Sequence, residues 1–294
     1  VGLEWDDFHP DGLEFYGDVS FLKAGVLAAD EVTTVSPTYA QGLRNGAGGG
    51  LEGVFESRGD RLTGIVNGID FARWSPSIDP HLISRYDAED VANKGRCKAA
   101  LLHELDLPLE PDRPLLVSLC RIDESGGADL LVQALPGIIR SGARLVVAAE
   151  SGDVDSELVA MLEDLAETRG DDVVYLGEAS EPLTHRLFAA ADAFVAPARF
   201  VPCGLTQQIA QRYGAVPIAH AAGGMVDTIV DCDAHCETGT GFLYGESTAA
   251  DLLGAVQRAV AAMKTPAWGA LRRRVMRLDV SWERPARRYA RLYR

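Results

Sequence analysis

Residues 199–214, RFVPCGLTQQIAQRYG, combine a tight turn with the start of a helix. Pro202 and Gly204 are typical of the turn, and the Thr206 hydroxyl is placed to cap the helix that follows. Backbone N–H groups at the start of a helix lack partners and attract anions. The stretch therefore predicts a turn that holds an anionic ligand, although Val201 at its mouth can accept no hydrogen bond.

A second glycine turn and an arginine are candidates to act with this turn. Gly223 and Gly224 precede another expected helix, and Arg121 follows the apolar run 115–119 after one residue. Each feature alone is a weak signal, because a glycine there more often only shapes a turn, and a lone arginine more often forms a surface ion pair. At equivalent strand ends, the three together favour a phosphorylated or sugar-phosphate ligand.

The elements that must position these residues alternate regularly between strand and helix from Pro114 onward. Short apolar strands separated by amphipathic helices are typical of a buried parallel sheet with helices on both faces. In such a doubly wound sheet, ligands bind outside the carboxyl ends of the strands. The expected strands are 115–119, 143–149, 173–177, 193–197 and 215–220, and the expected helices lie within 127–142, 156–170, 182–190, 199–214, 223–231, 249–264 and 266–278.

Residues 1–75 show a different pattern. The expected elements are a helix over 18–30 and strands over 31–36 and 62–66, with a loop from Pro37. They amount to one βα fragment without the neighbouring strands that a sheet needs. Because the chain begins with Val1 inside a segment that reads as structured, we expect an incomplete N-terminus.

Composition excludes several classes of partner. The 294 residues are 47% hydrophobic and carry a net charge of −15, which argues against nucleic acid and anionic membranes as partners. No apolar run approaches the roughly 18 residues of a membrane-spanning helix. Five widely spaced cysteines suit a reducing, cytoplasmic setting. Cys232, His235 and Cys236 lie close in sequence, but without a fourth ligand a surface loop is favoured over a zinc site.

Several motifs together resemble those of the bacterial glycogen synthases and plant starch synthases. The segments that carry the resemblance are FHPDGLEFYGDVSFLKAGVLAADEVTTVSPTYA, IVNGID, DLLVQALP, RFVPCGLTQ, QRYGAVPIAHAAGGMVDTIVD and VSWERPARRYARLYR. The resemblance covers essentially the whole chain but only the later part of such an enzyme. It implies the α/β, GT-B-type architecture, in which two Rossmann-like domains face each other across a cleft.

The resemblance also implies a division of the chain. Residues 1–62 would be the tail of an N-terminal acceptor domain that is otherwise missing, together with its Lys-x-Gly-Gly motif. Residues 63–281 would form the nucleotide-sugar-binding domain, a doubly wound Rossmann-like sheet. Residues 282–294 would form the helix that crosses back onto the N-terminal domain, which would explain an apolar stripe of Trp282, Tyr289 and Tyr293.

In that family the C-terminal domain binds ADP-glucose, and the enzyme transfers glucose, with retention, to the non-reducing end of an α-1,4-glucan. The resemblance implies no metal and no other cofactor. Arg121 would pair with the diphosphate, the turn of Gly204 would meet phosphate and glucose, and Asn67 would lie near the glucose. The residues that match donor-binding positions are Arg121, Gly204, Leu205, Thr206, Gly223, Gly224 and Asn67.

Three positions depart from the family pattern, and all three fall on ligand contacts. Val201 stands in place of a glutamate close to the chemistry, and Gly126 in place of a lysine that shares the charge of the diphosphate. Glu178 begins the segment that replaces a tyrosine expected to stack on adenine. Arg199 or Arg186 would be the nearest substitutes for the lost ammonium, although an arginine is not equivalent to a lysine there.

Three hypotheses follow. The chain is the donor half of a glycogen synthase, weak or inactive by itself. Alternatively, it is a non-catalytic homologue that keeps nucleotide-sugar or glucan binding. In the third hypothesis it is a glycosyltransferase that changed donor, with Val201 and Glu178 lining an altered pocket.

Overall fold

The computed structural model describes residues 2, 4–152 and 154–294. The chain divides into two compact units, Val1–Asn67 with Glu283–Arg294, and Gly68–Trp282. The first unit therefore draws on both ends of the chain. The expected domain bounds at residues 62 and 281 lie close to this division and stay a prediction.

A six-stranded parallel sheet forms the centre of the second unit. Its strand order is β10-β9-β8-β5-β6-β7, so the chain runs outward from β5 to β7 and then returns to the other side of β5. The order reverses between β5 and β8, which is the topological switch point of a doubly wound sheet. The strands are β5 (Leu115–Cys120), β6 (Arg144–Ala149), β7 (Val173–Glu178), β8 (Ala193–Ala196), β9 (Val216–His220) and β10 (Phe242–Tyr244).

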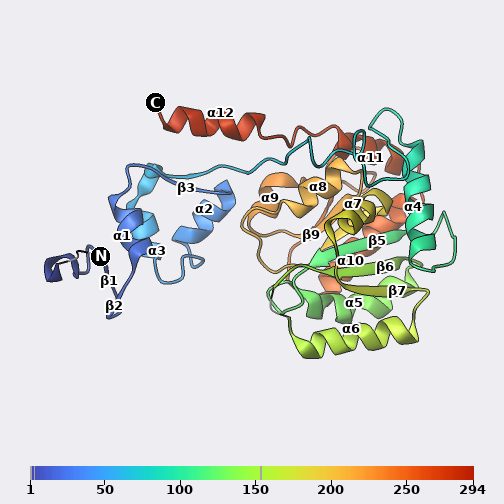
Figure 1. Ribbon diagram of the computed structural model, residues 1–294, viewed down its shortest axis with the longest axis horizontal. Coiled ribbons are helices and arrows are strands. Elements are labelled where there is room, and N and C mark those ends of the chain that lie inside the picture. The colour runs from blue at the N-terminus through green and yellow to red at the C-terminus, as the bar shows by residue number, and fades with distance from the viewer. Residues whose placement is uncertain (1, 3, 153) are drawn as a thin grey trace. The chain divides into compact units, whose positions relative to one another are not determined.

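Helices cover both faces of the sheet, and Figure 1 shows α5 and α6 on one side and α7 and α8 on the other. Successive strand residues point to opposite faces, so Leu116 joins one core and Val117 joins the second. The first core includes side chains from α5 (Ala128–Arg140), α6 (Ser156–Thr168), α10 (Ala249–Met263) and α11 (Ala267–Met276). The second includes side chains from α4 (Ala92–Glu104), α7 (Glu181–Ala190), α8 (Thr206–Arg212) and α9 (Gly224–Thr228).

The expected alternation from Pro114 onward is confirmed, with element ends shifted by a few residues. Two elements of this unit were missed. The sequence pattern gave no signal for α4, whose face carries the charged but buried Lys94 and Lys98. Strand β10 is only three residues long, too short for a periodic signal.

Two local expectations were wrong. Thr206 is the first residue of α8 rather than its cap, and Leu205 takes the cap position without a side-chain hydrogen bond. The segment after Ser36 is helical rather than a loop. There Pro37 occupies the first turn, and the Ser36 hydroxyl accepts a hydrogen bond from the Tyr39 N–H at 2.8 Å. Proline suits the first turn of a helix because its missing N–H is not needed there.

The first unit has a small core of its own, built around Leu43, Phe55 and Leu62. A parallel pair of strands, β3 and β4, and an antiparallel pair, β1 and β2, accompany its helices. The Arg288 guanidinium of the C-terminal helix donates to the Gly64 carbonyl at 3.2 Å, so both ends of the chain meet in this unit. The elements are β1 (Glu14–Phe15), β2 (Asp18–Val19), α1 (Phe21–Ala28), β3 (Val32–Thr34), α2 (Pro37–Arg44), α3 (Glu52–Ser57), β4 (Leu62–Gly64), α12 (Glu283–Leu292) and short 3₁₀ turns at Trp5–Asp7 and Gly59–Arg61.

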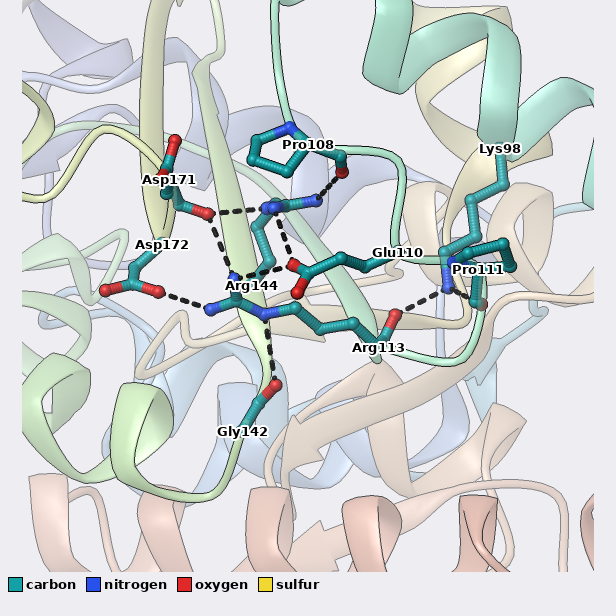
Figure 2. Close-up of polar contacts among 9 residues, drawn as sticks. All are labelled: Lys98, Pro108, Glu110, Pro111, Arg113, Gly142, Arg144, Asp171 and Asp172. Carbon is teal, nitrogen blue, oxygen red and sulfur yellow. Dashed lines mark hydrogen bonds and ion pairs between the residues drawn. The ribbon is translucent and has the colours of Figure 1, made fainter.

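A cluster of cations anchors the amino ends of β5 and β6 (Figure 2). The Arg144 side chain is buried and donates to the carbonyls of Asp171 at 2.7 Å and Pro108 at 3.2 Å, and to the Glu110 carboxylate at 3.2 Å. Arg113 bonds the same carboxylate and also the carboxylate of Asp172. The cluster ties the segments that precede β5 and β7 to the amino end of β6. It lies away from the carboxyl ends of the strands, where ligands bind in such folds.

Candidate functional site

A cavity of about 250 Å³ opens at the carboxyl ends of β5, β6 and β8. It lies at the switch point of the sheet, where doubly wound folds bind their ligands. Arg121, Gly204 and Thr206, which the sequence marked as donor-binding, line it together with Gly126 and Val201. The structure thus brings the turn of Gly204 and Arg121 to one place, although they are far apart in sequence.

The loop from Arg121 to Gly127 is organised around a single carboxylate. Asp123 accepts hydrogen bonds from the Ser125 hydroxyl at 2.8 Å and the Gly126 N–H at 2.6 Å, and forms an ion pair with the Arg121 guanidinium. Partial burial opposes ionisation of Asp123, but the hydrogen bonds from Gly126, Ser125 and Arg121 outweigh it and hold the pKa below its usual value. The Arg121 side chain stays 55% exposed.

At Gly126, where the sequence resemblance predicts a lysine, the structure leaves little space for a side chain. A Cβ at this residue would lie 2.1 Å from the Arg121 carbonyl oxygen, well inside any normal contact. The backbone of Arg121 therefore fills the space that a side chain at residue 126 would need. A lysine there would require the backbone to move.

The turn after β8 is held against this loop by Arg199. Its guanidinium contacts both oxygens of Asp129 at 2.7 Å and also the Glu124 carbonyl, while its N–H donates to the Ser125 carbonyl at 3.1 Å. The hydrogen bond to Asp129 raises the pKa of Arg199 above its usual value.

Both arginines considered as substitutes for the expected lysine already form ion pairs within the fold. Arg199 holds the turn, and Arg186 pairs with Glu104 at 2.7 Å, between α7 and α4. Their role in this structure is to hold elements together.

His220 at the end of β9 braces the same turn. Its Nδ1 lies 2.8 Å from the Arg199 carbonyl oxygen and its Nε2 lies 3.1 Å from the Gly245 carbonyl oxygen. The ring stacks on Tyr244 at 5.4 Å between centroids. Both ring nitrogens thus face acceptors, so the imidazole links the turn after β8 to the end of β10.

Gly223 and Gly224 pack against the backbone of the turn after β8, at Val201 and Cys203. A Cβ at Gly223 would lie 2.2 Å from the Val201 carbonyl oxygen, and one at Gly224 would lie 2.3 Å from the Cys203 carbonyl oxygen. The Gly224 N–H donates to the Val201 carbonyl at 2.8 Å. Glycine is needed here because two backbone segments approach closely.

The remaining expected site residues lie elsewhere. Leu205 is 41% exposed at the start of α8. Asn67 is the last residue of the first unit's N-terminal stretch. Glu178, expected to repel a diphosphate if it pointed inward, accepts a hydrogen bond from the Ser151 hydroxyl at the end of the edge strand β7.

Two further residues of the cavity lie just beyond strand ends, where the sequence rule places ligand-binding residues. Glu150 follows β6 and lines the cavity, and its burial raises the pKa of the carboxyl group, partly offset by the charge of Arg121. Phe200 adds an aromatic ring to the cavity wall. The strand-end rule predicts Glu150 as well, because it occupies the first position after a buried strand, as Arg121 does after β5.

Other candidate sites gain no support from the described residues. Cys232 and Cys236 are buried and His235 is exposed, and the described part of the chain holds no cluster of three or more side chains arranged for a metal. Within the same residues, no helix has both the length and the apolar character required to cross a bilayer.

Comparison with known proteins agrees with this geometry. The family profile for the starch synthase catalytic domain matches residues 1–57, and that for glycosyl transferases group 1 matches residues 113–262, half of the chain. The glycogen synthase of Thioalkalivibrio sulfidiphilus is 42% identical over 98% of this chain, and that of Anaeromyxobacter sp. is 42% identical over all of it. The chain spans 60% and 62% of their lengths.

Among solved structures, the catalytic domain of starch synthase IV from Arabidopsis thaliana, bound to ADP and acarbose, superposes with a TM-score of 0.91. It is 33% identical, and the match covers 99% of this chain and 62% of that one. The expected GT-B-type α/β fold is thereby confirmed. The chain belongs to the glycosyl transferases group 1 family, as a homologue of the bacterial glycogen synthases.

Proposed function

We propose that this chain is the nucleotide-sugar-binding part of a glycogen synthase, which transfers glucose from ADP-glucose to the non-reducing end of an α-1,4-glucan. The observation that carries the proposal is the cavity at the switch point, where Arg121 faces the turn of Gly204 and Thr206. A cation and a helix start facing one cavity suit the diphosphate of a sugar nucleotide. The solved relative bound to ADP and acarbose supports both the nucleotide and the glucan.

The residues present would contribute mainly electrostatic stabilisation. As the bond between glucose and diphosphate breaks, negative charge grows on the departing ADP, and Arg121 would stabilise it. The N–H groups at the start of α8 would face the same phosphates. With no metal ion in this proposal, a chelator should leave the transfer rate unchanged.

The substitutions at Val201 and Gly126 should lower the rate of glucose transfer rather than move the binding site. A lost charged contact commonly costs ~1.5–3 kcal/mol. Losing the lysine and the glutamate together would lower the transfer rate by roughly three to four powers of ten relative to a chain that has both. A cytoplasmic location belongs to this proposal, because all five cysteines are free thiols, as in reducing compartments.

Calorimetry with ADP and with ADP-glucose, followed by incorporation of labelled glucose into glycogen, tests the proposal. We expect ADP to bind and Arg121→Ala to weaken that binding at least tenfold. Arg186→Ala is the matched control, because it removes an arginine ion pair of α7 outside the cavity. Binding without transfer would fit both a donor half that is inactive by itself and a non-catalytic homologue, whereas binding of another sugar nucleotide in preference to ADP-glucose would identify a changed donor. Absence of any ADP binding would refute the proposal.

A further inference from the structure

The groups that would meet a donor phosphate in this cavity are already held by a carboxylate of the chain itself. Arg121, Ser125 and Gly126 all line the cavity. Their guanidinium, hydroxyl and N–H all converge on Asp123. A cation, a hydroxyl and an N–H group are the partners that a phosphate oxygen seeks.

The geometry points to Asp123 as an internal competitor of the anionic donor, a residue that sets how tightly this site binds a diphosphate. The inference rests on the proposed function and adds a specific determinant of donor affinity. Because Asp123 lies two residues from Arg121 on the same loop, it competes intramolecularly, at a high effective concentration. A donor must displace it to use Nη2, the Arg121 nitrogen that Asp123 holds.

Charge repulsion acts in the same direction as this competition. Asp123 remains an anion beside the cavity, and Glu150 places a second carboxyl group in the cavity wall. Like charges close to a diphosphate oppose its binding. Since Gly126 leaves no room for an ammonium group, Arg121 is the cation for which Asp123 and the donor compete.

Asp123→Asn separates the charge from the shape of the loop. An asparagine retains an oxygen that can accept from Ser125 and Gly126, but it loses the ion pair with Arg121. Calorimetry of the full chain with ADP should show affinity raised at least tenfold. Affinity for adenosine, which has no phosphate, should stay the same.

Asp155→Asn is the matched control. Asp155 follows the next strand and accepts from the N–H groups of Glu157 at 2.9 Å and Leu158 at 3.3 Å, at the start of α6. It is also a loop carboxylate that accepts from backbone N–H groups, but its partners lie outside the cavity. We expect no change in ADP affinity. In an Arg121→Ala background, Asp123→Asn should give a much smaller gain, because the contested cation is gone and only the charge repulsion is relieved.

The outcomes distinguish this inference from the proposed function. If the unmodified chain binds ADP through Arg121 and Asp123→Asn binds it equally well, the inference is overturned and the proposed function stands. A gain with Glu150→Gln but not with Asp123→Asn would also overturn it, since the opposing anion would then be Glu150. If the unmodified chain and the Asp123→Asn chain both fail to bind ADP, the proposed function itself is refuted.

Discussion

The two ends of β5 and β6 use the same residue types with opposite results. At the amino ends, Arg144 is 1% exposed and bonded to backbone carbonyls and a carboxylate, so every partner is part of the fold. At the carboxyl end of β5, the Arg121 side chain is 55% exposed and its recorded partner is one neighbouring carboxylate. A buried arginine with fixed acceptors is structural. An exposed one with an exchangeable partner is available to a ligand.

The largest effect should come from the amino end. Arg144→Ala would leave the carbonyls of Asp171 and Pro108 without their donor and remove a buried side chain, so we expect a loss of about 3 kcal/mol of stability. Denaturation in urea measures it. The folded fraction should still bind ADP as the unmodified chain does. A drop in ADP affinity without a loss of stability would break the comparison.

At the carboxyl end of β5, a substitution should affect ADP affinity more than stability. Arg121→Ala should lower ADP affinity by about 2 kcal/mol, as for the loss of a hydrogen bond to a charged group. Its stability should change by less than ~0.5 kcal/mol, because an exposed ion pair contributes little. Calorimetry and urea denaturation of the same preparation measure the two quantities. A large loss of stability here would mean that Arg121 is structural as well.

Gly126→Ala tests the closed position of the missing lysine. The added Cβ would meet the Arg121 carbonyl, so we expect a loss of about 1–2 kcal/mol of stability. Gly254→Ala in α10 is the control, because a Cβ there has open space, and alanine should stabilise a helix by ~0.5–1 kcal/mol. Equal effects of the two substitutions would show that the loop can open, and Gly126→Lys would then be worth testing for a gain in transfer rate.

The smallest effect concerns pH. The hydrogen bond from Arg199 holds the pKa of Asp129 below its usual value of about 4. Because the folded pKa is the lower one, this contribution is complete above the unfolded pKa and is lost as pH falls through the folded pKa. Asp129→Asn should therefore lose less stability than the unmodified chain between about pH 5 and pH 2. Melting temperatures across that range measure it, and parallel curves would contradict the assignment.

Much of the fold and part of the site were predictable from local patterns. The apolar runs 115–119 and 143–149, separated by an amphipathic segment, predicted neighbouring parallel strands, and β5 and β6 are such a pair. The rule that ligands bind beyond strand ends led to Arg121 and the turn of Gly204, which line one cavity. Helix α4 was not predictable in the same way, because Lys94 and Lys98 on its buried face obscure the apolar period.

The sequence by itself determined the alternation of strands and helices from Pro114 onward, the family and the identity of the residues beyond those strand ends, because these depend on spacing along the chain. Only the tertiary structure decided which of those residues face the cavity and which are already engaged. Asp123 forms an ion pair with Arg121, Arg199 forms one with Asp129, and Gly126 has no space for a side chain. All three depend on how the loop from Arg121 to Gly127 packs. Such contacts follow from the three-dimensional approach of backbone and side chains, which periodicity does not report.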